Sequence, residues 1–130
     1  MVTTISEHFS NELAEWSHSV NFHMTDTDRL EKKLTSVIRR DNIPGIASQV
    51  ESHLHQLEKI SGIFQMLQYD IRDQETLLLA YKHKQEDDKL NKADVQQKQA
   101  ILRLNMQAAE KEFIDIKFGC YDFIADSLKK

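Results

Sequence analysis

The chain contains very few of the residues that interrupt helices. Its 130 residues include only three glycines, at positions 45, 62 and 119, and a single proline, Pro44. A protein of short strands and tight turns needs many such residues, so their scarcity argues against a β-rich fold. The length is typical of one domain and is sufficient to bury a core. We therefore expect residues 1–130 to form a single domain of a few long helices.

Other scarcities narrow the class of protein. The single cysteine, Cys120, excludes an intramolecular disulfide and fits a reducing compartment. The longest apolar run, Leu77–Tyr81, is far too short to span a membrane, and the first residues lack the segments of a signal peptide. The net charge of −4 gives the chain no general affinity for nucleic acid, because such binding depends on clustered lysine and arginine that neutralise phosphates. We expect a cytoplasmic protein without a membrane or nucleic-acid partner.

Apolar residues recur at intervals of three and four along three stretches, which is the spacing of one face of a helix. The capping-box pattern Thr4-Ile-Ser-Glu7 predicts a first helix over about residues 5–40. Pro44 suits the first turn of a second helix, over about 44–84. Asn91 is a candidate cap for a third, over about 92–128. Similar lengths and short turns predict an all-α, elongated up-down-up antiparallel three-helix bundle with coiled-coil-like packing.

An alternative architecture divides the first helix. Thr25-Asp-Thr-Asp28 is polar, and Asp28-x-x-Glu31 forms a second possible capping box, so a break near residues 25–28 would give a four-helix bundle. The apolar rhythm keeps its phase across this segment, and for that reason we favour three helices.

One short motif has the spacing of metal ligands. Glu15-Trp-Ser-His18 is a Glu-x-x-His sequence, which in ferritin-like proteins projects into the bundle from two helices. Here it occurs once, and a helical wheel turns His18 away from the apolar stripe. We interpret it as part of a solvated face and expect no metal ion or cofactor.

Three polar residues do lie on the apolar stripes: His23, Thr27 and His53. With antiparallel first and second helices, the two histidines are about 12 Å apart along the axis, at about 1.5 Å per residue, too far to share a metal ion. We interpret all three as polar seam positions, which fix the register of packed helices at some cost in stability.

The segment HLHQLEKISG, residues 53–62, resembles the phosphoacceptor helix of histidine phosphotransfer domains. Those domains are helical bundles of similar size with an exposed reactive histidine, and the resemblance implies that role for His55. The Lys-Gly pair that the family has just after its histidine is replaced here by Glu58-Lys59. A metal-binding or phosphotransfer-like bundle is therefore the alternative to a non-catalytic one.

A second set of apolar residues lies away from the main stripes. Ile114, Phe118 and Tyr121 recur on the opposite side of the third helix, and the arc of the second is widened by Ile63, Met66 and Leu77. If exposed, they form a candidate partner surface; the alternative is burial within an asymmetric monomer. No nucleophile elbow or phosphate-binding glycine loop is present in the sequence. We expect a non-enzymatic structural or protein-interaction bundle, whose simplest partner is a second copy in a homodimer.

Overall fold

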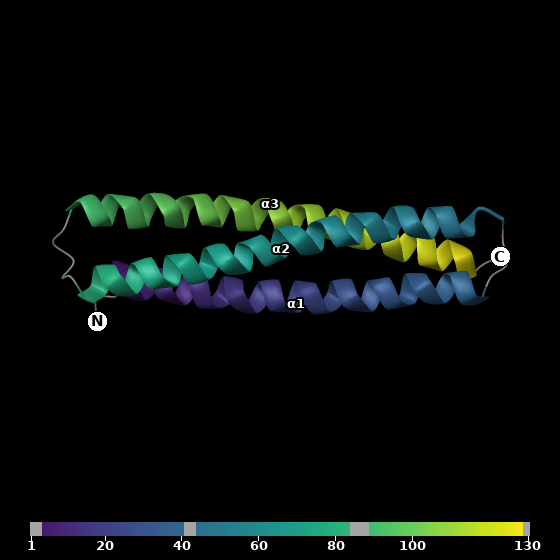
Figure 1. Cartoon of the computed structure of the whole chain (residues 1–130), viewed down its shortest axis with the longest axis horizontal. Helices are drawn as coiled ribbons and strands as arrows, with labels where there is room; N and C mark the ends of the chain where they lie inside the picture. The colour runs from purple at the N-terminus through teal and green to yellow at the C-terminus, as the bar shows by residue number, and fades with distance from the viewer. Residues whose placement is uncertain (1–3, 41–43, 84–88, 129–130) are drawn as a thin grey trace. The chain divides into compact units, whose positions relative to one another are not determined.

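The computed structural model describes residues 4–40, 44–83 and 89–128, and all of its regular structure over these residues is helical. The three helices are α1 (Ile5–Arg40), α2 (Ile46–His83) and α3 (Lys89–Leu128), and they pack against one another (Figure 1). The prediction of an all-α three-helix bundle is confirmed. None of the described helical stretches is both long and apolar enough to cross a membrane.

The first helix begins at the predicted cap and does not break. Thr4 Oγ1 accepts a hydrogen bond from the backbone N–H of Glu7 at 3.1 Å, as a capping box requires. The helix then continues through residues 25–28 to Arg40, so the four-helix alternative is wrong. The possible second capping box, Asp28-x-x-Glu31, does not begin a new helix. The two residues before it are buried in the continuous helix: Thr27 donates to the carbonyl of His23, and Asp26 accepts from Lys117.

The other two helices differ from prediction at their starts. Helix α2 begins at Ile46 rather than at residue 44, because Gly45 has a φ of 84°, which an α-helix excludes. The predicted end of this helix at residue 84 lies outside the described residues. Helix α3 begins at Lys89 rather than 92, so Asn91 lies within the helix and is not its cap.

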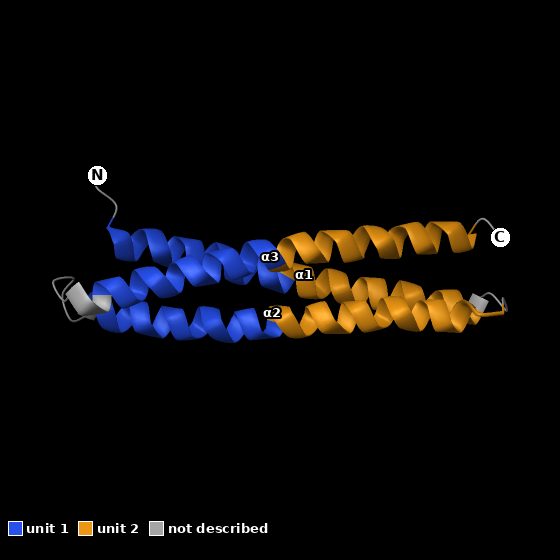
Figure 2. Ribbon diagram, turned by 90° about the horizontal axis from the view of Figure 1, so that it is seen from above, with its two compact units in different colours: residues 1–21, 65–108 blue, residues 22–64, 109–130 orange. Residues whose placement is uncertain are grey.

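The contacts among the helices divide the chain into two compact units, each drawn from all three helices (Figure 2). Unit 1 comprises residues 1–21 and 65–108, and unit 2 comprises residues 22–64 and 109–130. The assignment of the whole chain to a single domain stays a prediction.

In unit 1, the buried apolar residues follow the predicted stripes. They are Leu13, Val20, Leu67, Ile71, Leu78, Tyr81, Val95, Leu102 and Met106. Helices α1 and α3 run parallel here, since Phe9 and Glu12 bond the side chain of Gln99 and Glu12 also bonds Arg103. Helix α2 runs antiparallel to α1: its Gln68 bonds Asn21, whereas Gln74, further along, bonds Gln99.

Unit 2 repeats this arrangement with other residues. Its buried apolar side chains are Leu30, Leu34, Val37, Ile46, Val50, Leu57, Ile60, Phe64, Ala109, Phe113 and Cys120. Along α3, Phe113 contacts Phe64 and Cys120 contacts His53, so α2 again runs opposite to α3. Burying such side chains contributes about 1.5–3 kcal/mol each, and this contribution holds the helices together.

Candidate functional site

Helix α3 carries an exposed apolar row within unit 2. Ile114, Phe118 and Tyr121 are all exposed, Phe118 to 64% of its surface. Lys111 and Ala125, also exposed, extend this row in both directions. The five residues alternate steps of three and four, the heptad spacing of a helix that packs against another helix. We refer to Lys111, Ile114, Phe118, Tyr121 and Ala125 as the α3 row.

The three candidate interface residues of α2 are placed differently. Ile63 is half-buried in unit 2, whereas Leu77, also half-buried, and Met66 belong to unit 1. Met66 is 66% exposed. Four of the six candidates are therefore exposed: Met66, Ile114, Phe118 and Tyr121. The alternative, burial within an asymmetric monomer, is excluded for these four side chains. The proposal of a partner surface keeps its physical basis at those positions.

Two lysines flank the aromatic ring of Tyr121 in the α3 row. Lys33 Nζ lies 5.5 Å from the ring centroid and Lys117 Nζ lies 6.0 Å from it. Cations over the face of an aromatic ring at such distances are attracted to it by about 0.5–1 kcal/mol at exposed sites. These contacts orient Tyr121 beside α1 and surround the end of the row with positive charge.

The polar seam residue His23 packs in an aromatic cluster of unit 2. Its ring stacks on Phe64 with centroids 5.2 Å apart, and the Phe113 ring lies 5.0 Å away. His23 Nε2 is 2.9 Å from a carboxylate oxygen of Glu110, while Nδ1 is buried without a partner. A carboxylate only accepts, so the hydrogen bond to Glu110 requires a proton on Nε2 of His23.

The next seam residue, Thr27, is buried beside an ion pair. Its hydroxyl donates to the backbone carbonyl of His23 at 2.9 Å, one helical turn back. Asp26, only 7% exposed, accepts a 2.8 Å hydrogen bond from Lys117 on α3. This polar segment of α1 remains helical because its side chains are satisfied within the helix or across to α3.

The third seam residue, His53, is half-buried and contacts the only cysteine. Its Nδ1 lies 4.0 Å from Cys120 Sγ, and its ring lies 4.7 Å from the ring of Phe123. Burial lowers the pKa of His53 and raises the pKa of the Cys120 thiol to about 11. Both groups are thus neutral near pH 7, which disfavours a thiolate nucleophile at this position.

The histidines considered for metal binding or phosphotransfer lie on the surface. Glu15 and His18 are exposed, as the helical wheel predicts, and so is His55. Among the described residues, no group of three or more histidine, cysteine, aspartate or glutamate side chains is arranged to hold a metal ion. The phosphotransfer role of His55 stays a hypothesis.

A polar network joins all three helices of unit 1. Glu12 receives two hydrogen bonds of 2.7 Å from Arg103 and one of 2.9 Å from Gln99. Gln99, which is fully buried, in turn accepts one from Gln74 on α2. The hydrogen bonds from Arg103 hold the pKa of Glu12 below its usual value, against the effect of burial.

The charged partners in both units were not foreseen from the sequence: Glu12, Asp26, Arg103, Glu110 and Lys117. A signal was present, since these side chains flank the apolar stripes at the positions that form pairs between packed helices. Sequence spacing cannot assign the partners, because each pair depends on the register between α1 and α3.

Comparison with known proteins adds no family to this geometry. None of the family models, curated proteins or solved structures compared with the chain matches it.

Proposed function

We propose that the protein is a non-catalytic interaction module that self-associates through the α3 row. The observation that supports this is the row itself: a heptad pattern on α3 whose members other than Lys111 are apolar, exposed on the side away from its buried stripe. Contiguous exposed apolar side chains are typical of protein-interaction sites. We further propose a cytoplasmic location, which the single free cysteine supports.

The spacing of the row suits a twofold symmetric pair of α3 helices. In an antiparallel pairing centred at the level of Ile116, Ile114 of one copy lies level with Phe118 of the other. Lys111 lies level with Tyr121 and beside Asp122, which is exposed. Four of the five side chains of the row therefore meet another member of the same row, and the fifth, Ala125, lies level with the exposed Gln107.

The expected affinity is modest. Each copy contributes only three large apolar side chains, whereas a standard stable interface uses roughly 20–30 residues a side. A dissociation constant of about 10–100 µM is a reasonable expectation for such an interface.

The test is the mass of the protein as a function of concentration. Sedimentation equilibrium from about 5 µM to about 500 µM should show conversion from monomer to dimer over this range. Phe118→Asp places a charge at the centre of the interface and should abolish the dimer. Leu79→Asp is the matched control, because Leu79 is similarly exposed, at 57%, but lies on α2 in unit 1.

The helical circular dichroism of both variants should equal that of the parent protein, which verifies that they fold. A mass that stays monomeric over the whole range, or a dimer that survives Phe118→Asp, would refute self-association through this row.

A further inference from the structure

Unit 1 contains a groove between α2 and α3 that the α3 row does not use. Its volume is about 560 Å³. Apolar side chains line both walls, Leu77 and Ala80 on α2 and Ile101 and Leu102 on α3. Ile101 is half exposed. We refer to this feature as the α2/α3 groove.

The α2 wall of the groove carries two carboxylates, Asp70 and Asp73. Within the part of the chain that the structure describes, neither has an ion-pair partner. On the opposite wall, the ammonium group of Lys98 lies 3.4 Å from a carboxylate oxygen of Asp94 in the same helix and forms an ion pair with it. The groove is thus acidic on one side and nearly neutral on the other.

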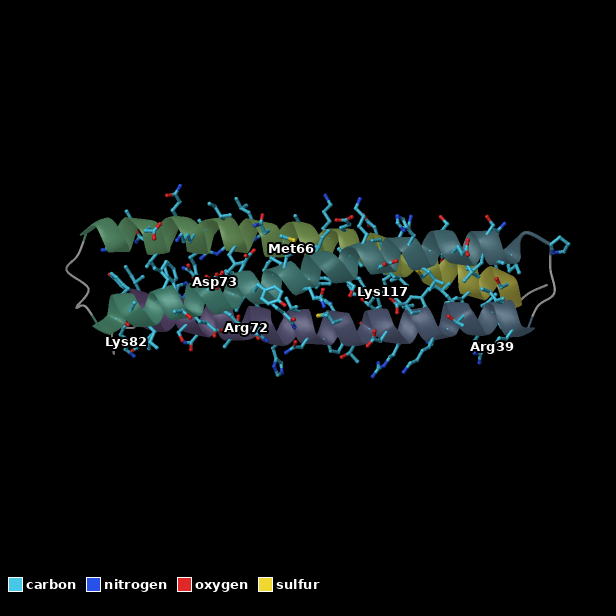
Figure 3. All side chains as sticks on the ribbon, in the orientation of Figure 1. Arg39, Met66, Arg72, Asp73, Lys82 and Lys117 are labelled. Atoms are coloured by element: carbon cyan, nitrogen blue, oxygen red, sulfur yellow. The ribbon has the colours of Figure 1, made fainter. Side chains whose placement is uncertain are left out.

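Helix geometry continues the apolar lining beyond the groove. Met66, Asp70, Asp73, Leu77 and Ala80 recur at steps of four and three along one side of α2. Met66 and Asp73 both lie on the side of α2 that faces α3 (Figure 3). The exposed thioether of Met66 therefore lies on the same side of α2, about one turn beyond Asp70.

A buried side-chain amide of the groove has a carbonyl oxygen that accepts no hydrogen bond. Gln74, which is 3% exposed, lines the groove and donates to Val95 O at 3.0 Å and to Gln99 Oε1 at 2.9 Å. Its own Oε1 is buried without a partner. An unsatisfied buried carbonyl costs about 1–3 kcal/mol, and this oxygen lies beneath the surface of the groove.

We propose that the α2/α3 groove binds a basic amphipathic helix of a partner protein. The apolar side of such a helix seats on Met66, Leu77 and Ile101, as in other helix-in-groove complexes. Lysine or arginine beside that apolar side pairs with Asp70 and Asp73. This surface is separate from the α3 row, and its use does not depend on self-association.

A second copy of the chain is a poorer occupant. A twofold pairing of two α2/α3 faces would bring both acidic walls into one interface. Like charges brought together in this way oppose association. Charge complementarity therefore selects a positively charged helix of a different protein.

The test uses designed peptides of about 18 residues with leucine at helical intervals of three and four. The first peptide carries lysine beside the leucine stripe, and two matched peptides carry glutamine or glutamate at the same positions. Binding is followed by the amide chemical shifts of the isotope-labelled full chain. The lysine peptide should shift residues 66–80 and 98–105, and the glutamate peptide should bind at least about tenfold more weakly.

Variants then assign the binding to the groove. Asp70→Asn with Asp73→Asn should weaken the lysine peptide about fivefold, as expected for two exposed ion pairs. Ile101→Asp should weaken all three peptides about tenfold or more. The control is Asp115→Asn with Asp126→Asn, which removes two exposed carboxylates of unit 2 and should leave the affinity unchanged.

Three results would overturn the proposal: no binding of the lysine peptide, equal binding of the glutamate peptide, or shifts confined to unit 2. Phe118→Asp separates this inference from the proposed dimer, because the monomeric variant should bind the lysine peptide as tightly as the parent. Binding that is lost with Phe118→Asp would mean that the peptide needs the dimer and not the groove alone.

Discussion

Among single residues, Gln99 best explains how polar groups are accommodated in the core of unit 1. Its amide nitrogen donates to Phe9 O and Glu12 Oε1, and its oxygen accepts from Gln74. Every hydrogen-bonding atom of the side chain is therefore satisfied although it is fully buried. Such a network opposes a shift of α3 along α1, because a shift would leave these atoms unpaired.

Glu12 links this network to Arg103, and its ionisation should make stability depend on pH. Its folded-state pKa is lowered from 4.5, first by hydrogen bonding to Arg103. The stabilisation is therefore complete above the unfolded pKa and is lost as the pH falls through the lowered folded pKa. Glu12→Gln should reduce the free energy of unfolding by about 1–2 kcal/mol at neutral pH, and urea titrations at about pH 7 and pH 3 should show this difference shrinking.

Glu31 offers a control of opposite sign. Burial, with smaller effects of Asp28 and Glu58, raises its pKa above 4.5. A raised pKa means that folding favours the protonated form, so the advantage exists at low pH and is lost as the pH rises through the folded pKa. Glu31→Gln should thus stabilise the protein at neutral pH by about 0.5 kcal/mol.

For Glu12→Gln, a loss of stability that is equal at about pH 7 and pH 3 would contradict the explanation by ionisation of Glu12.

At the scale of the helix, two threonines of α1 make opposite kinds of hydrogen bond. Thr4 precedes the helix and accepts from the backbone N–H of Glu7. Thr35 lies within it and donates to the carbonyl of Glu31 at 2.8 Å. The first bond satisfies a backbone group that has no partner in the helix, whereas the second duplicates a bond that the helix already makes.

Thr4→Ala should therefore lower the free energy of unfolding by about 1 kcal/mol. Thr35→Ala should be neutral or slightly stabilising, because alanine has the higher helix propensity. Chemical denaturation followed by circular dichroism compares the two exposed Thr→Ala changes directly. Equal losses for both would show that the capping hydrogen bond does not contribute to stability.

Much of each helix could be predicted from residue spacing, and the exceptions have physical causes. Leu13, Val20, Leu30 and Leu34 recur at core intervals, so burial follows from local periodicity. The start of α2 could not be read from Pro44 alone, since it depends on the positive φ of the next residue, Gly45.

Interactions between helices were less predictable. Asp26 looked like part of a helix break, and only the position of Lys117 on another helix explains its burial. Three of the five members of the α3 row were recognised from the sequence, because only large apolar residues were counted. The α2/α3 groove was not foreseen, since it depends on the distance between two helices and on the side chains of both walls.

For the molecule as a whole, the relation between the two units raises the question of cooperativity. Each unit has its own buried residues, yet α1 passes without interruption from residue 21 to 22, α2 from 64 to 65 and α3 from 108 to 109. Unfolding one unit alone would create three new helix ends, each with unsatisfied backbone groups. We therefore expect the two units to unfold together.

Native-state hydrogen exchange of Leu57→Ala tests this expectation. Leu57 is fully buried in the core of unit 2, and its truncation should cost about 2–4 kcal/mol. If unfolding is cooperative, the slowest amides of both units should exchange about 30- to 1,000-fold faster, by a similar factor in each. Faster exchange confined to residues 22–64 and 109–128 would show instead that unit 2 opens independently and that the chain behaves as two domains in series.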